Sequence, residues 1–88
     1  MTNTEKKLRK QALNPSLEVT IRVGKSGLTE SVVDELDSQL KSRTMVKAKL
    51  NRGLADDSAD RQNLWQMLAE QTSSKLILIR GNIAVFYR

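Results

Sequence analysis

The feature that most constrains this fold is a change of hydrophobic period between residues 17 and 41, from two residues to about 3.6. Over 17–23 apolar and polar residues alternate strictly, which is the pattern of a half-buried strand. The apolar positions, expected to share one face, are Leu17, Val19, Ile21 and Val23. Beyond a glycine-containing segment, Val33, Leu36 and Leu40 recur at helical spacing. The sequence therefore predicts a strand, a loop and a helix over about 30–41.

The same two periods alternate along the rest of the chain. The predicted elements are helix 4–13, strand 17–23, helix 30–41, strand 44–50, a helix starting near Asp57, and strands 75–79 and 83–87. Gly81-Asn82 between the last two strands is a hairpin signal. We expect one domain of α/β class (α+β, two-layer), with a four-stranded mixed sheet and order α-β-α-β-α-β-β.

Three local signals refine the helices. Thr29 is an N-cap candidate, and Leu28 and Val33 have the spacing of a hydrophobic staple. Asp57 can cap the third helix, where acids in the first turn suit the helix dipole. The inner stripe of that helix is predicted to contain Leu64, Met67 and Leu68, with Trp65 in or beside the core.

The composition excludes several functions and indicates a type of partner. The chain has no Cys and no His, which removes disulfides, thiolate metal sites, cysteine nucleophiles and imidazole bases. Its 15 Lys and Arg against 10 Asp and Glu give a net charge of +5, which favours an anionic partner such as nucleic acid. No apolar segment has the length of a signal sequence or a membrane span, so we expect a cytoplasmic protein.

The charges are segregated along the chain. Residues 1–27 carry six bases and two acids, and residues 43–53 carry four bases and no acid. By contrast, residues 28–42 and 54–73 each carry four acids and one base. We therefore expect acidic outer faces on the last two helices, and phosphate contacts at the first helix, the glycine loop and the exposed edges of the first two strands.

The segment Gly24-Lys25-Ser26-Gly27 joins the first strand to its helix. Glycine lets the backbone approach a ligand closely, and the helix that follows offers free N–H groups to a phosphate. The spacing lacks the extra residues of a dinucleotide fingerprint or a P-loop, and a simple tight turn would also explain it.

Other constellations are better explained structurally. Glu30, Asp34 and Asp37 share a helix face and could hold Mg²⁺, but such carboxylates are usually a solvated face. Asp56 and Asp60, with Asp57, fit capping and dipole roles, and Tyr87 fits packing in its strand better than base stacking. We expect no catalytic residues, no metal and no cofactor.

Several motifs resemble those of a known family. The motif-bearing segments are Leu8-Arg9-Lys10-Gln11-Ala12, Val19 to Val32 with the central Gly24-Lys25-Ser26-Gly27-Leu28-Thr29, Val46-Lys47-Ala48-Lys49, and Val85-Phe86-Tyr87-Arg88. Over nearly the whole chain the sequence is similar to the CRM domain (chloroplast RNA splicing and ribosome maturation) in its single-domain, YhbY-like form. The resemblance implies the element order above, a fold like the C-terminal domain of the third bacterial initiation factor, and binding to precursors of the large ribosomal subunit. Leu13 departs from the histidine that many members carry.

These observations lead to a specific hypothesis. We expect a non-catalytic, monomeric RNA-binding protein in ribosome biogenesis, with no membrane or small-molecule partner. The expected RNA-binding residues are Gly24, Lys25, Ser26, Gly27, Arg22, Arg9, Lys10, Lys47, Lys49 and Arg52. The alternatives are a protein-interaction adaptor that docks on the ribosome through the acidic helices, a Mg²⁺-dependent nuclease using the carboxylates, and a duplex-DNA binder.

Overall fold

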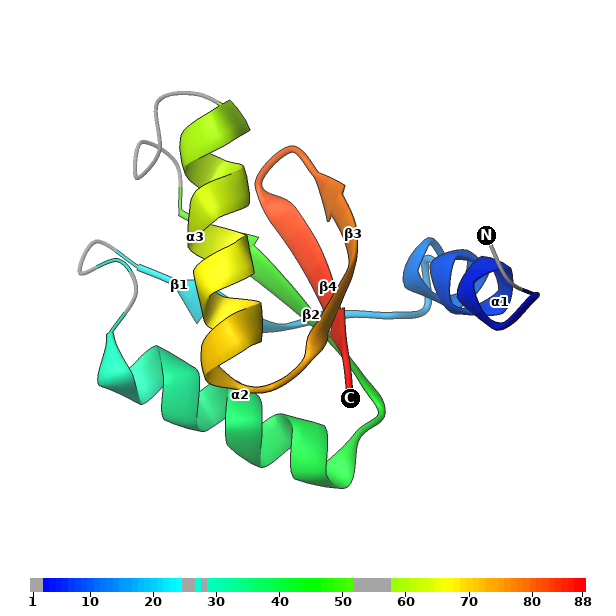
Figure 1. Cartoon of the computed structure of the whole chain (residues 1–88), viewed down its shortest axis with the longest axis horizontal. Coiled ribbons are helices and arrows are strands. Elements are labelled where there is room, and N and C mark those ends of the chain that lie inside the picture. Colours follow the sequence, from blue (N-terminus) through cyan, green and yellow to red (C-terminus); the bar gives the residue numbers. More distant parts are fainter. Residues whose placement is uncertain (1–2, 25–26, 28, 52–57) are drawn as a thin grey trace.

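The computed structural model describes residues 3–24, 27, 29–51 and 58–88, and these form three helices and four strands in the predicted order (Figure 1). The helices are α1 (Asn3–Ala12), α2 (Glu30–Ser42) and α3 (Ser58–Gln71). The strands are β1 (Val19–Val23), β2 (Met45–Leu50), β3 (Lys75–Arg80) and β4 (Ile83–Tyr87). Each predicted element is therefore confirmed, with boundaries that move by a few residues at most.

The strands form one mixed sheet in the order β1-β2-β4-β3. β1 and β2 are parallel and connected through α2, while β4 pairs antiparallel with both β2 and β3. The fourth strand thus lies between the second and third, so β1 and β3 form the two edges. The predicted mixed four-stranded sheet is confirmed.

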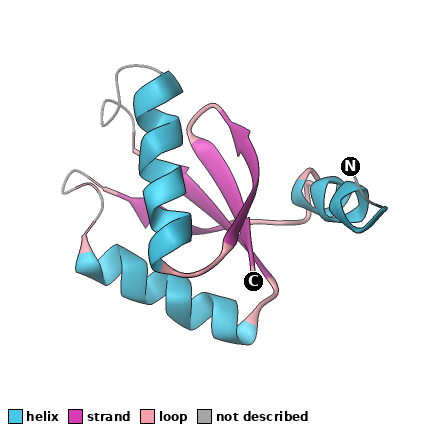
Figure 2. Cartoon of the chain, in the orientation of Figure 1, coloured by secondary structure: helices cyan, strands magenta, loops and turns pink. Residues whose placement is uncertain are grey.

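One face of the sheet packs against α2 and α3 (Figure 2). Leu36 and Leu40 of α2 join Trp65, Leu68 and Ala69 of α3 in the core. The strands contribute Ile21, Val23, Val46, Ala48, Leu50, Ala84 and Phe86 to the same cluster. Trp65 is fully buried, as predicted, and meets the Phe86 ring edge to face at a centroid distance of 5.9 Å.

The first helix packs on the opposite face, beside β3, and stands apart from the other two helices in Figure 1. The Lys75 ammonium of β3 lies 3.2 Å from the Glu5 carboxylate of α1. Lys75 pairs with Tyr87 and Tyr87 with Met45, whose neighbour Val46 is in the core. Because partners share a face and successive residues alternate, these three side chains lie on the face away from α2 and α3. We call this side of the sheet the open face.

The strict alternation predicted for β1 is wrong at one point. The register with β2 shifts between Val19, which pairs with Lys47, and Ile21, which pairs with Ala48. This bulge puts one extra residue, Thr20, into β1, and the Thr20 hydroxyl donates to Gln39 Oε1 of α2 at 2.5 Å. Val19 therefore lies on the open face with Lys47, while Ile21 and Val23 point to the core.

The inner stripe predicted for α3 is also partly wrong. Met67 is 51% exposed, whereas Trp65, Leu68, Ala69 and Thr72 are buried. A helix turns by about 100° per residue, so a stripe centred on positions 65, 68 and 72 leaves position 67 facing water.

Two helix ends explain why the chain changes direction where it does. The Thr29 hydroxyl accepts from Val32 N at 3.3 Å, which confirms the predicted N-cap of α2. At the end of α3, Ser74 N donates to Ala69 O and Ser73 N to Glu70 O, with Ser73 at φ 52°. This is a Schellman motif with serine in the left-handed position that glycine usually takes. The predicted Leu28 staple and Asp57 cap lie outside the described residues.

The hairpin between β3 and β4 has a two-residue loop, because Arg80 pairs with Ile83 across it. Gly81 has φ 59°, a conformation that a hairpin of this length requires and that glycine adopts without strain. Within the described ranges, none of the helices combines the length and apolar character that crossing a membrane would demand.

Candidate nucleic-acid interface

A row of cationic side chains crosses the open face of the sheet. Arg22 of β1 pairs with Lys49 of β2, Lys49 pairs with Ile83 of β4, and Ile83 pairs with Arg80 of β3. We call Arg22, Lys49 and Arg80 the cation row; Ile83 separates its last two members. With strands spaced about 4.8 Å apart, the row spans roughly 14 Å.

All three members of the cation row are exposed, and their chain neighbours Val23, Leu50 and Ile79 point to the other face. No ion pair with another described residue engages any of the three. Placing like charges side by side without counter-charges is electrostatically unfavourable, and a bound polyanion would relieve that cost.

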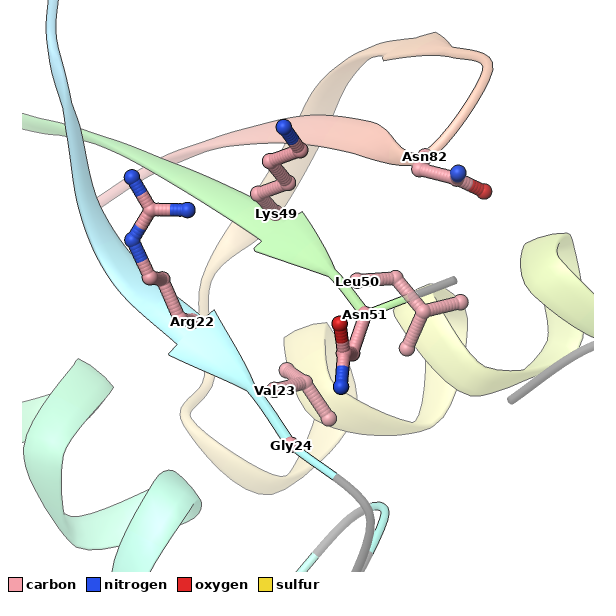
Figure 3. A pocket seen from close by; sticks show the side chains of 7 residues that line it. All are labelled: Arg22, Val23, Gly24, Lys49, Leu50, Asn51 and Asn82. Atoms are coloured by element: carbon pink, nitrogen blue, oxygen red, sulfur yellow. The ribbon is translucent and has the colours of Figure 1, made fainter. Parts of the chain in front are cut away.

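A hollow of about 640 Å³ lies beside Arg22 and Lys49, the two members of the cation row on β1 and β2 (Figure 3). Its lining residues are Arg22, Val23, Gly24, Lys49, Leu50, Asn51 and Asn82. Two backbone bonds hold its walls together, from Asn51 N to Val23 O at 2.9 Å and from Leu50 N to Asn82 O at 2.7 Å. In Figure 3 the Arg22 and Lys49 side chains extend from adjacent strands, and Asn82 stands at the β3–β4 turn.

The glycine segment borders this hollow. Gly24 lines it directly, and Gly27 N donates to Gly24 O at 2.9 Å, which closes a turn. Gly27 has φ 70°, a conformation that L side chains rarely adopt. The turn therefore lies immediately beside Arg22. Lys25 and Ser26 lie outside the described residues, as does Arg52.

The structure separates the other predicted bases from the cation row. Lys47 lies on the open face but is half-buried, and its ammonium donates to Leu17 O at 3.2 Å. Arg9 and Lys10 are exposed on the last turn of α1. The expectation that the bases lie along strand edges is wrong for β2, which is an interior strand, so Lys49 projects from a face instead.

Arg80 was not among the predicted site residues, although the structure places it in the row. Its position depends on β4 lying between β2 and β3, a pairing that brings together residues 49, 80 and 83. The one local signal is its place directly before the Gly81-Asn82 turn. That turn predicts that Arg80 pairs with Ile83, but it does not predict that the hairpin lies beside β2.

Six of the eight acids among the described residues lie on α2 and α3, in the other layer, and one of these six has a structural role. Arg88 Nη1 lies 2.6 Å from Asp37 Oδ1 and 2.8 Å from Thr72 O, so it connects α2 to the end of α3. The Arg88 hydrogen bond, with Lys41 adding to it, lowers the pKa of Asp37 below its ordinary value of 3.8. Glu30 and Asp34 of α2 are exposed. In the part of the chain described, no three Asp or Glu side chains are grouped to hold a metal ion.

Comparisons with known proteins agree with this architecture. A family model, the CRS1 / YhbY (CRM) domain, matches residues 1–88. The chain is 32% identical over 84 residues to the "Probable RNA-binding protein" of Pseudomonas aeruginosa, covering 96% of this chain and 78% of that one. A second "Probable RNA-binding protein", from Methanocaldococcus jannaschii, is 31% identical over 72 residues, or 82% of this chain and 52% of that one.

A solved structure shows the same fold. The solution structure of a Staphylococcus aureus protein, described as "a putative RNA binding protein", superposes with a TM-score of 0.78 at 28% identity. The match covers 96% of this chain and 82% of that one. On sequence and structure together, the chain belongs to the CRS1/YhbY (CRM) domain family.

Proposed function

We propose that this protein binds RNA through the cation row and the adjoining glycine turn, and that it holds the RNA without catalysing a reaction on it. The observation that carries the proposal is the row itself: Arg22, Lys49 and Arg80 aligned across the open face with no counter-charge among the described residues. Relatives named "Probable RNA-binding protein" support RNA binding as the activity.

The row suits a phosphate backbone. Lys and Arg side chains gain affinity for a polyanion by releasing its condensed counterions, which makes binding depend steeply on salt. The glycine turn beside Arg22 lets the RNA approach the backbone closely at the same place. Phosphate contacts position the RNA, while the amide group of Asn82 borders the same hollow and suits contacts with base edges or 2′-hydroxyls.

The proposed RNA is a precursor of the large ribosomal subunit, bound by a monomer in the cytoplasm. The support for this choice is the family resemblance of the Gly24-Lys25-Ser26-Gly27 segment and its flanking motifs. A competition assay among fragments of ribosomal RNA, transfer RNA and duplex DNA, at one fixed salt concentration, tests it. Preference for a ribosomal fragment is the expected result, and equal competition by duplex DNA would contradict it.

The test of the binding surface is charge reversal at two positions, Arg22→Glu with Lys49→Glu. Both side chains are exposed, so the fold should tolerate the change. We expect the affinity for a ribosomal RNA fragment to fall by at least about tenfold. The slope of log affinity against log salt should decrease by about two, because each lost phosphate contact removes roughly one unit.

The matched control reverses two bases elsewhere, Arg43→Glu with Arg61→Glu. Arg43 lies directly after α2 and Arg61 lies on α3, so both are away from the cation row. The net charge changes by the same amount, so general electrostatic attraction is reduced equally. A control that loses as much affinity as the test variant would show that the row is not the binding surface.

A further inference from the structure

A second hollow on the open face differs from the first because it is mainly apolar. It has a volume of about 340 Å³ and lies between the end of α1 and the sheet. Its lining residues are Ala12, Leu13, Lys47, Leu78, Arg80 and Ile83. Arg80 is a member of the cation row, and Ile83 lies between Arg80 and Lys49 in that row. The hollow and the cation row are therefore continuous.

The register explains the apolar character. The next set of paired positions on the open face, beside the row, is Val19 of β1, Lys47 of β2, Val85 of β4 and Leu78 of β3. The ammonium of Lys47 is turned to Leu17 O, so its aliphatic stem, rather than its charge, remains to line the hollow. Leu13 at the rim is 51% exposed.

The charge around the hollow indicates what would fill it. Arg80 at the rim is exposed and has no ion-pair partner among the described residues, and a planar guanidinium can both bind phosphate and stack on a base. A purely apolar protein side chain could fill the hollow, but it would leave the adjoining positive charge without a counter-charge. The phosphates of an uninterrupted duplex would neutralise the positive charge, but its bases are stacked inside the helix and cannot reach the hollow.

An unpaired nucleotide can both fill the apolar hollow and neutralise the charge of Arg80, since it combines a flat apolar base with a phosphate. The volume lies near the lower end of the range for small-molecule sites, about 300–1,000 Å³, which is suitable for one base rather than for a helix or a strand. We propose that this hollow, lined by Leu13, Leu78 and Ile83, accepts an unpaired base of the RNA whose phosphates lie on the cation row. The RNA class is therefore a helix interrupted by a bulge or loop. This inference rests on the proposed function.

The test compares two RNA hairpins of equal charge, one fully paired and one with a single bulged nucleotide. In both, a non-nucleotide linker replaces the terminal loop, so that the bulge supplies the only unpaired base. The variant is Leu13→Ala, and the matched control is Met67→Ala, because both side chains are 51% exposed and Met67 lies on α3, on the other side of the sheet. Wild type should bind the bulged hairpin more tightly. Leu13→Ala should weaken the binding of that hairpin by about fivefold and leave the paired hairpin unchanged, whereas Met67→Ala should change neither.

A fluorescent base gives a direct measurement. With 2-aminopurine at the bulged position, wild type should change the emission on binding, and Leu13→Ala should reduce that change. Equal wild-type affinity for the two hairpins, or equal weakening of both by Leu13→Ala, would overturn the inference while leaving RNA binding intact. If wild type binds neither hairpin, nor any ribosomal fragment, the proposed function fails instead. If Leu13→Ala abolishes capture of a protein and leaves binding of both hairpins unchanged, the hollow is a protein-docking site and the inference is wrong.

Discussion

At the scale of single residues, Lys47 and Lys49 show what sequence spacing leaves undetermined. They lie two positions apart in β2, so alternation correctly predicts that both face the same side of the sheet. Lys49 is exposed and belongs to the cation row, whereas the Lys47 ammonium is bonded to Leu17 O. The difference arises from the path of the segment between α1 and β1, a tertiary feature without a signal in the spacing of the two lysines.

Asp37 carries a pH prediction at the same scale. Arg88 holds its pKa below the ordinary value of 3.8, so the ionised carboxylate stabilises the fold above that value. The contribution is lost as the pH falls through 3.8 and then through the lowered pKa. Asp37→Asn should therefore lower Tm by a constant amount above about pH 5 and by progressively less at more acidic pH.

Thermal unfolding of both proteins across this pH range measures the effect. Asp34→Asn is the control, since it removes the same charge from the same helix at an exposed position. If Asp37→Asn and wild type differ in Tm by the same amount at every pH, the Arg88 contact does not stabilise the ionised form.

At the scale of elements, periodicity predicted all seven helices and strands, because each has one apolar face that must be buried. It did not predict the bulges in β1 and β3, where the register shifts by one residue. The bulge at Thr20 depends on its hydrogen bonds with Gln39 of α2, which lies nineteen residues away. Local spacing has no information about such a partner. It also does not determine which side of α3 faces the sheet, and for this reason Met67 was wrongly predicted to be in the inner stripe.

The end of α3 provides a prediction about stability. Ser73 sits in the left-handed region at φ 52°, which costs a residue with a Cβ roughly 1 kcal/mol. Ser73→Gly should relieve that cost, and we expect the free energy of unfolding to rise by about 0.5 kcal/mol after the greater freedom of glycine in the unfolded chain is included. Urea denaturation measures the change.

Ser73→Ala is the matched control, since it removes the hydroxyl but keeps the Cβ. It should give no gain in stability. A gain equal to that of glycine would mean that the hydroxyl, and not the backbone conformation, is the source of the cost.

At the scale of the whole molecule, the sheet separates two kinds of surface. The helices α2 and α3 carry exposed acids on one side, including Glu30 and Asp34, while the cation row lies on the other. The segregation of charge along the sequence predicted this difference between faces. It did not predict Arg80, because the row is complete only when β4 lies between β2 and β3. Pairings over such sequence distances are not encoded in local patterns.

The central claim, that RNA contacts the cation row, is tested most directly by amide chemical shifts. The labelled protein is titrated with a ribosomal RNA fragment, and shifts are followed residue by residue. The largest changes should fall on Arg22, Gly24, Lys49, Arg80 and Asn82, with little change along the exposed faces of α2 and α3. Changes concentrated on those two helices, with the cation row unaffected, would contradict the account.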